Sequence, residues 1–404
     1  MADIREIDFN GKKVLVRVDF NVPLDKDGNI TDDTRMQRAL PTLRHILDNG
    51  GSLIIMSHLG RPQKKLTEDG LINVEKFTLK HLVEHLEELL EVHVEFVSEP
   101  FSDQSKTICS ALEIGDVVLL ENTRFHKGES KGDEEMGKAL ADLSDIFIND
   151  AFGTAHRAHA STYTTATFFS QENKAFGFLM EDELKNGYQL MNQAEKPVTA
   201  IVGGAKVSDK IQLIENLMNF ADNILVGGGM SYTFYKSLGY PVGDSICEDE
   251  FVPLATKLLE KAEQTNTKIY LPEDINIADA FDDDANTRIV SKDEIPDKWQ
   301  GLDIGPLTMA VYREVLLESK SILWNGPVGV FEMPNFAKGT NSLARSIAEA
   351  TENGAYSLIG GGDSVSAIAE AGLTDKMSFI STGGGAMLEL LEGKKLPGVA
   401  AIES

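Results

Sequence analysis

The chain has 404 residues, 42% of them hydrophobic and 25% charged, which excludes a disordered or low-complexity protein. Its length suffices for about two domains, each with a hydrophobic core of its own. Acidic residues outnumber basic ones by 64 to 38, and the resulting net charge of −26 disfavours contact with nucleic acid and anionic lipid. We therefore expect no nucleic-acid partner and no membrane partner.

The cysteines and the apolar segments exclude further classes of protein. Cys109 and Cys247 stand in no CxxC spacing, which excludes a disulfide framework and a cysteine-type zinc site. The first residues lack the basic and apolar regions of a secretory signal, and no apolar run reaches the ~18 residues of a membrane span. We expect a cytoplasmic protein.

In the first half, short apolar runs rich in β-branched residues alternate with helical stretches. Strands are predicted at 13–20, 52–58, 92–97, 116–122 and 145–151, and an amphipathic helix at 74–91. Strands that are apolar throughout and separated by helices are typical of parallel sheets buried on both faces.

A second series of the same kind follows a polar stretch at 181–195 that is predicted to be helical. Its strands are predicted at 197–203, 223–228, 268–274, 321–327, 356–361 and 377–382, and its helices at 209–221, 251–265 and 337–352. The sequence thus predicts an α/β fold with two lobes, 1–175 and 197–391, joined by a connector helix within 176–196. Ligands of such folds bind at the carboxyl ends of the strands.

Three familiar patterns are weak here. Residues 132–139 nearly match a phosphate-binding loop, but acidic residues stand where phosphate would lie and Ala139 replaces the metal-binding hydroxyl. His81 and His85 have the spacing of a zinc-peptidase helix, which a solvent-exposed helix face explains better. The GxGxxG dinucleotide fingerprint is absent, which disfavours a dehydrogenase.

Cationic side chains follow successive strands of the first half. In chain order, the strand ends carry the polar pair Asp19 and Asn21, then His58 and Arg61, then Arg124, and then the segment 152–159 with Arg157 and His159. Arg35 lies at the start of the helix that follows Asp32 and Asp33. Neighbouring strands lie about 5 Å apart, so these guanidinium groups would converge and repel one another. A bound phosphate or carboxylate is the ordinary compensation, and we expect an anion site here.

Glycine clusters follow strands of the second half. Gly203–Lys210 is predicted to open a helix with Lys206 and Lys210 on one face, and 360–364 stands between a strand and a helix. Such turns let phosphate approach backbone N–H groups, and Asp363 beside them suggests an intervening Mg²⁺. Residues 324–332 would add an apolar surface for a base and Glu332 for ribose hydroxyls. The pattern favours a nucleotide site.

The chain contains, in this order, RVDFNVP, SHLGRP, LLENTRFH, NDAFGTAHRAH, GGAKVSDKI, WNGPVGVFE, IGGGDS and STGGGA with LELLEGK. In this combination it resembles the phosphoglycerate kinase family from end to end. The resemblance implies two Rossmann-like lobes with parallel sheets, a hinge helix, and a C-terminal tail at 392–404 that packs back on the first lobe. It also implies a monomeric glycolytic enzyme that transfers a phosphoryl group between 1,3-bisphosphoglycerate and MgADP, giving 3-phosphoglycerate and ATP, with Mg²⁺ as cofactor.

The resemblance also assigns roles to individual residues. The triose side would comprise Asp19, Asn21, Arg35, His58, Arg61, Arg124 and Arg157. The nucleotide side would comprise Lys206, Lys210, Gly228, Asn325, Glu332, Gly361, Gly362, Asp363 and Ser364, with Asp363 at the metal. Arg35, Lys206, Gly361 and Gly362 would be catalytic. Ser364 and Met387 depart from the residues that many members carry at these positions, Thr and Ser respectively.

Such a transfer requires no general base, because an acyl phosphate is an activated donor and the β-phosphate of ADP is already anionic. It requires the two lobes to close so that water is excluded. Two alternatives remain: another carboxylate (acyl-phosphate) kinase, and a non-catalytic two-lobed protein that binds a phosphorylated metabolite.

Overall fold

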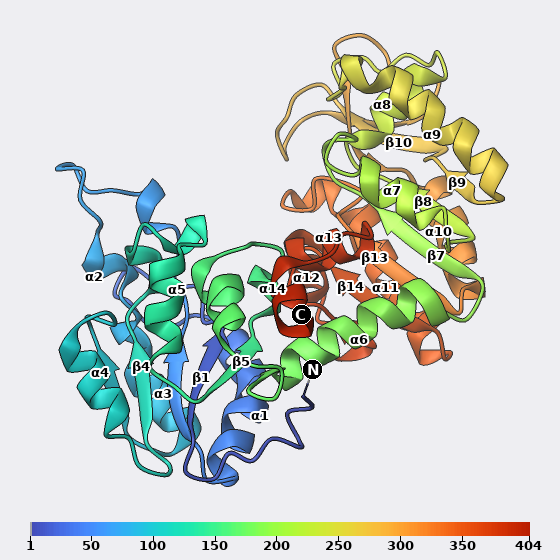
Figure 1. Cartoon of the computed structure of the whole chain (residues 1–404). Helices are drawn as coiled ribbons and strands as arrows, with labels where there is room; N and C mark the ends of the chain where they lie inside the picture. The colour runs from blue at the N-terminus through green and yellow to red at the C-terminus, as the bar shows by residue number, and fades with distance from the viewer. Residues whose placement is uncertain (1) are drawn as a thin grey trace. The chain divides into compact units, whose positions relative to one another are not determined.

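The computed structural model describes residues 2–404, which form two compact units. The first unit comprises the residues up to Leu184 together with Lys395–Ser404, and the second comprises Lys185–Lys394. In each unit, strands of a central sheet are flanked by helices (Figure 1).

The first unit is built on a six-stranded parallel sheet in the order β3-β4-β2-β1-β5-β6. Its strands are β1 Lys13–Val18, β2 Ser52–Met56, β3 Val94–Val97, β4 Val117–Leu120, β5 Ile146–Asp150 and β6 Lys174–Phe176. In register, Val14 of β1 lies opposite Leu53 of β2 on one side and Ile146 of β5 on the other. The five predicted strands are confirmed, and β6 is an addition at the edge.

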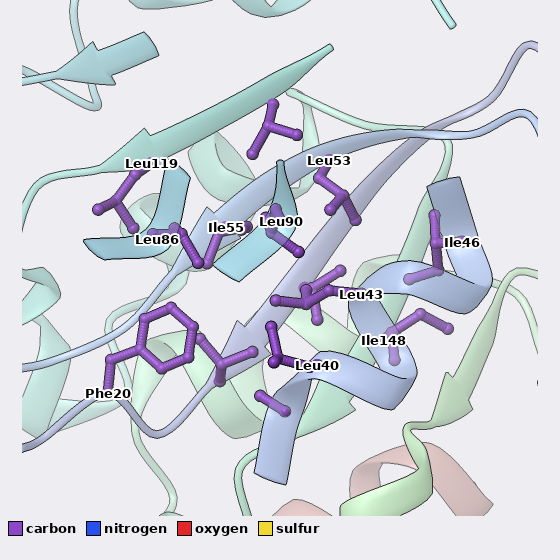
Figure 2. Packing of buried hydrophobic residues seen from close by; sticks show 14 of the residues in the cluster. Phe20, Leu40, Leu43, Ile46, Leu53, Ile55, Leu86, Leu90, Leu119 and Ile148 are labelled. Carbon is purple, nitrogen blue, oxygen red and sulfur yellow. The ribbon is translucent and has the colours of Figure 1, made fainter. Parts of the chain in front are cut away.

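Helices cover this sheet, and α1 shows why the sequence forms them. The helices are α1 Thr34–Asp48, α2 Val74–Phe77, α3 Val83–Leu90, α4 Asp103–Ser110, α5 Glu134–Ala141 and α14 Pro397–Glu403; α6 Phe178–Gln193 begins in this unit. Leu40, Leu43 and Ile46 recur at helical spacing and pack on Ile148 and Leu53 of the sheet (Figure 2). Burying each such side chain contributes about 1.5–3 kcal/mol.

The single helix predicted at 74–91 is wrong. The chain is extended at Thr78 between α2 and a short 3₁₀ segment, Leu79–Leu82, that precedes α3. The Thr78 hydroxyl donates to Glu121 Oε2 at 2.6 Å and the Leu79 N–H donates to Oε1 at 2.9 Å. A buried carboxylate from the end of β4 therefore starts a new helix here, which the local pattern does not reveal.

The C-terminal residues belong to the first unit. The Gly398 N–H donates to Ala155 O at 2.8 Å, and Val399 and Ile402 are buried. A Cβ at position 398 would lie 3.0 Å from Ala155 Cα, so glycine permits this close approach of α14 to the loop after β5.

The second unit contains another six-stranded parallel sheet, in the order β15-β14-β13-β7-β8-β9. Its strands are β7 Val198–Val202, β8 Asn223–Val226, β9 Lys268–Tyr270, β13 Ser321–Asn325, β14 Tyr356–Gly360 and β15 Phe379–Ile380. Its helices are α7 Ile211–Leu217, α8 Met230–Ser237, α9 Val252–Thr265, α10 Pro306–Glu318, α11 Lys338–Glu352, α12 Gly362–Glu370 and α13 Gly385–Leu391. The predicted fold class, α/β with two largely parallel sheets, is confirmed.

A three-stranded antiparallel sheet in this unit was not predicted. It has the order β11-β10-β12, with β10 Asp274–Ala278, β11 Thr287–Ser291 and β12 Gln300–Ile304. The strand expected at 268–274 is divided, because β9 ends at Tyr270 and Asp274 opens β10. The Asp274 carboxylate accepts from the Leu307 and Thr308 N–H groups at 3.0 and 2.8 Å and so caps α10, an interaction between distant residues.

Asp150, at the end of β5, links stability of the first unit to pH. Its Oδ1 accepts from the Met180 N–H at 3.2 Å, its Oδ2 has no partner within residues 2–404, and burial raises the pKa of the carboxyl to about 7. Because the folded pKa exceeds the unfolded value of about 4, stability falls as pH rises between them, by up to about 1.4 kcal/mol per pH unit.

Asp150→Asn should remove this loss, because an amide does not ionise. We expect the variant to gain stability relative to the wild type as pH rises from 5 to 8, measured by urea unfolding at each pH. Asp142→Asn, which changes an exposed carboxylate of the same unit, is the control. Its stability should vary with pH as that of the wild type does. A constant difference between Asp150→Asn and the wild type across this range would contradict the assignment.

Candidate active site

The carboxyl edge of the first sheet gathers most of the predicted residues. Asp19 and Asn21 follow β1, His58 and Arg61 follow β2, Arg124 lies in a 3₁₀ turn after β4, and Arg157 lies in the loop after β5. Because β4, β2, β1 and β5 are neighbours in that order, the sheet topology brings these loops to one edge.

Arg35 joins this edge from helix α1. The helix begins at Thr34, and its first turn places the Arg35 guanidinium against the loop after β1. Arg35 Nη1 donates to Asp19 Oδ2 at 2.8 Å, and His58 Nδ1 lies 3.8 Å from Asp19 Oδ1. Asp19 therefore stands between two nitrogen-bearing side chains that come from different elements.

Gly60 connects Asn21 to Arg124. Its N–H donates to Asn21 Oδ1 at 2.7 Å, and its carbonyl accepts from Arg124 Nη1 at 2.7 Å. The residue has a φ of +62°, and a Cβ here would lie 2.5 Å from a ring carbon of Phe77, so both the conformation and the space require glycine. The loop after β2 thus orients two candidate ligands through its backbone.

Three guanidinium groups of this edge have no carboxylate partner in the described part of the chain. Within residues 2–404, Arg61, Arg124 and Arg157 form no ion pair shorter than 4 Å, and Arg61 and Arg157 are exposed. The pKa of Arg124 is lowered to about 10, first by burial and then by the positive charge of Arg17, and the carboxylates of Glu129 and Asp19 offset the shift only in part. Unpaired guanidinium groups of this kind favour a bound anion.

A buried polar network under this edge was missed by the sequence reasoning. Arg17 on β1 is fully buried, and its Nε donates to Ser161 Oγ at 2.8 Å. The Ser161 hydroxyl donates in turn to Glu129 Oε1 at 2.6 Å, and the Thr123 hydroxyl donates to the same oxygen at 3.2 Å. One signal was available: an arginine between the valines of the buried part of strand KVLVRV must find polar partners.

His159 is not the cation that the sequence predicted. It is buried, and burial, with Arg124, Arg17 and Arg157 nearby, lowers its pKa to about 4, although Glu129 opposes the shift. At neutral pH this imidazole is therefore uncharged. The arginines and not the histidines supply the positive charge of the edge.

In the second unit, the predicted residues also follow neighbouring strands. The segment 203–210 follows β7, Gly228 follows β8, Asn325 ends β13, and 360–364 follows β14. The strands β14, β13, β7 and β8 are adjacent in that order, so their carboxyl ends form one edge. Gly228 has a φ of +69°, and a Cβ there would lie 2.7 Å from Gly204 O, which packs these two turns closely together.

Lys206 and Lys210 do not lie on one face of a helix, contrary to the prediction. Helix α7 begins only at Ile211, because Ser208 donates its N–H and hydroxyl to Glu248 at 3.0 and 2.6 Å and is held in a loop. Lys210 Nζ donates to Asn325 Oδ1 at 2.5 Å, whereas Lys206 is exposed. Burial lowers the pKa of Lys210, and the carboxylates of Asp209, Glu392 and Asp363 partly offset it.

The N-terminus of α12 is open to a phosphate. Gly361 precedes the helix with a φ of +90°, and the first N–H groups of a helix have no partner within it. Ser364 is fully buried, and its hydroxyl accepts from the Gly326 N–H at 2.6 Å, which joins this turn to the loop after β13. Asp363 and Glu332 are exposed.

Three other sequence interpretations have an outcome in the structure. Trp324 is fully buried in the core and its Nε1 donates to Gly326 O at 2.8 Å, so its ring does not supply a surface for a base. Asp133 caps α5 by accepting from the Met136 N–H at 2.9 Å, as expected of a helix start. His85 pairs with Asp33 at 2.9 Å, and among residues 2–404 no three or more His, Cys, Asp or Glu side chains are grouped so that they could hold a metal ion.

Known proteins resemble this chain along its whole length. The family model for phosphoglycerate kinase matches residues 4–394. The phosphoglycerate kinase of Porphyromonas gingivalis is 48% identical over 99% of both chains, and "Phosphoglycerate kinase 3, cytosolic" of Arabidopsis thaliana is 49% identical over 100% of this chain and 98% of its own. The chain belongs to the phosphoglycerate kinase family.

Solved structures of this family agree with the fold. The phosphoglycerate kinase structure from Coxiella burnetii has a TM-score of 0.87 and 38% identity over 98% of this chain and 97% of its own. That from Pyrococcus horikoshii has a TM-score of 0.82 and 31% identity over 100% and 98%. The predicted family is confirmed, and with it the status of a kinase. No helix within residues 2–404 combines the length and apolarity needed to cross a bilayer.

Glu129 should be essential to the stability of the first unit. Glu129→Ala leaves the buried Arg17 without its compensating charge, and such a change destabilises by about 3–5 kcal/mol. Glu135→Ala, at an exposed carboxylate nearby in sequence, should alter stability by no more than about 0.5 kcal/mol. The measurement is urea unfolding at pH 7. Equal stability of the two variants would refute the role assigned to Glu129.

Proposed function

We propose that this chain catalyses reversible phosphoryl transfer from 1,3-bisphosphoglycerate to MgADP, giving 3-phosphoglycerate and ATP in glycolysis. The observation that carries the proposal is that Arg61, Arg124 and Arg157 gather at the first sheet's carboxyl edge without an ion-pair partner among the described residues, in a chain of this family. The glycine-rich edge of the second sheet supports the same reaction. We further propose that the protein acts as a monomer in the cytoplasm.

The first unit is proposed to bind the phosphorylated triose. Arg61, Arg124 and Arg157 would pair with the phosphate that stays on the substrate, because planar guanidinium groups bind phosphate oxygens bidentately. His58 would add a hydrogen-bond donor, while Asp19 and Asn21 would orient the hydroxyl and carboxyl groups. The bonds of Gly60 to Asn21 and Arg124 hold two of these side chains before the substrate arrives.

The second unit is proposed to bind the nucleotide. The N–H groups of Gly361 and Gly362 would receive phosphate oxygens at the positive end of α12. Lys210, already bonded to Asn325, and the exposed Lys206 would neutralise them. The remaining proposed contacts are Gly228, Asn325 and Ser364 in the adjoining turns and the exposed Glu332 toward the ribose.

A magnesium ion fits the residues of this edge. Mg²⁺ is commonly held by one or two carboxylates together with substrate phosphates and waters, and so needs no cage of protein ligands. Asp363 supplies one exposed carboxylate beside the N-terminus of α12, which matches that donor set. When bound with ADP, Mg²⁺ would neutralise phosphate charge during transfer.

Catalysis would rest on positioning and charge, since the reaction needs no general base. We propose that Arg35, Lys206 and the N–H groups of Gly361 and Gly362 stabilise the equatorial oxygens of the transferred group. Because the donor and acceptor sites belong to different units, the reaction also requires the units to approach through a hinge, for which α6 is the proposed element.

Arg35→Ala tests the proposed reaction and the role of this residue together. In an assay that follows ATP formation from 1,3-bisphosphoglycerate and MgADP, the wild type should be active. The variant should lose about 10²–10³-fold in kcat, as expected for one preorganised charge donor, with nearly unchanged ADP affinity. Arg38→Ala, one turn along the same helix and exposed, should match the wild type.

The two failures of this experiment are distinct. A wild-type protein that forms no ATP would overturn the proposed reaction. Wild-type turnover in Arg35→Ala would overturn only the role of Arg35.

Asp363→Asn tests the proposed metal site. The amide cannot supply the anionic ligand, so calorimetric titration should show MgADP binding weakened by an order of magnitude or more, while metal-free ADP binds at least as well as to the wild type. Glu370→Gln, at the exposed far end of α12, should leave both affinities unchanged. Equal losses with and without magnesium would exclude a metal role for Asp363.

A further inference from the structure

Arg17 makes a contact that determines the state of a neighbouring imidazole. Its side chain is fully buried on β1, and its Nη2 lies 3.2 Å from Nδ1 of His58, which is itself only 3% exposed. A guanidinium has five N–H donors and no acceptor. For this contact to be a hydrogen bond, His58 Nδ1 must accept, and the proton of the neutral ring must lie on Nε2.

We propose that Arg17 is a positioning residue that holds His58 as the neutral Nε2–H tautomer and thereby directs the Nε2–H donor at the substrate's phosphate. The inference rests on the proposed function for the identity of the anion. The tautomer itself can be measured without any substrate.

The position of Arg17 is determined on every side. Its Nε donates to Ser161 Oγ at 2.8 Å, and its Nη1 donates to the carbonyl of Val18. Ser161 is held at both ends, since its N–H and hydroxyl donate to the two oxygens of Glu129 at 3.0 and 2.6 Å. The guanidinium therefore cannot turn its Nη2 away from His58 without losing several buried hydrogen bonds.

The opposite nitrogen of His58 is available to a ligand. Nε2 has no hydrogen-bond partner within residues 2–404, and it is not among the polar atoms that are sealed from solvent. His58 follows β2 at the edge that also carries Arg124 and Arg35. An N–H at this position can donate to a phosphate oxygen, whereas the lone pair of the other tautomer would repel it.

The surroundings of His58 also oppose its protonation. Burial lowers its pKa well below the usual range, and the positive charges of Arg17 on β1, Arg124 after β4 and Arg35 on α1 lower it further, as does His159 after β5. Asp19, at 3.8 Å, is the one carboxylate within 4 Å of a ring nitrogen among residues 2–404, and it is already paired with Arg35. His58 thus supplies a directional donor while the arginines supply the charge.

The direct test is nitrogen-15 NMR of the ligand-free wild type with labelled histidine, from pH 5.5 to 8. The two ring nitrogens have different shifts in the two tautomers and in the imidazolium ion. We expect the His58 signal, assigned by its loss in His58→Gln, to show the Nε2–H form at every pH. An Nδ1–H pattern, or a titration with a midpoint in this range, would overturn the proposal whatever the enzymatic assay shows.

Arg17→Met tests the causal role of the arginine, because the apolar chain fills similar space without a donor. We expect His58 to populate both tautomers or to titrate. KM for 3-phosphoglycerate should rise on the order of tenfold, as for one lost hydrogen bond to a charged group, and should become pH-dependent between pH 5.5 and 7. If the variant retains the pure Nε2–H form and a pH-independent KM, Arg17 does not set the tautomer.

Ser161→Ala is the matched control. It removes the support of Arg17 by Glu129 but leaves the Arg17 donor beside His58, so a merely structural role predicts the same behaviour in both variants. We expect Ser161→Ala to lower the urea midpoint while the Nε2–H signal persists. Loss of that signal in Ser161→Ala together with its retention in Arg17→Met would show that packing, and not the arginine donor, controls the ring. If Arg17→Met does not fold, the wild-type spectrum still decides the tautomer.

Discussion

The compensation of one buried positive charge organises the first unit's edge. Arg17 lies in a strand buried on both faces, where an unpaired guanidinium would be strongly unfavourable. Glu129 supplies the compensating carboxylate through Ser161 and also accepts from Thr123. Because Thr123 follows β4 and Ser161 lies after β5, the same carboxylate joins the two loops that carry Arg124 and Arg157. The buried carboxylate that compensates Arg17 thereby also positions the loops of Arg124 and Arg157, which have no carboxylate partner within residues 2–404.

The two sheets reach anion binding by different physical means. At the first, Arg61, Arg124 and Arg157 gather with no carboxylate of the described residues in ion-pair contact, so a bound anion would relieve their mutual repulsion. At the second, backbone N–H groups at the start of α12 and a partly buried Lys210 lie near several carboxylates. An acidic neighbourhood of this kind suits a phosphate that arrives with its own cation. Because the chain as a whole carries a net charge of −26, the positive potential at each of these two sheet edges is a local feature.

Elements that depend on neighbouring residues in the sequence were predicted correctly, whereas elements that depend on distant residues were not. The strands β1, β2, β4 and β5 were predicted because a buried parallel strand is apolar along its own length. The helix predicted at 74–91 failed because Glu121, over 40 positions away, starts a new helix at Leu79. The helix predicted to carry Lys206 and Lys210 fails for the same reason, since Glu248 holds Ser208 in a loop outside α7. The antiparallel sheet around β10 likewise depends on pairing between distant strands, which no local pattern predicts.

By itself, the sequence determined the two α/β series, the family, and which polar residues follow which strands, because each of these is written in contiguous residues. Only the tertiary structure decided that Trp324 is core, that His159 is uncharged at neutral pH, and that Arg17 contacts His58. These three outcomes depend on burial and on the charges of residues from other strands. Dielectric environment and hydrogen-bond direction are properties of the packed chain, and they exist only once distant segments have met.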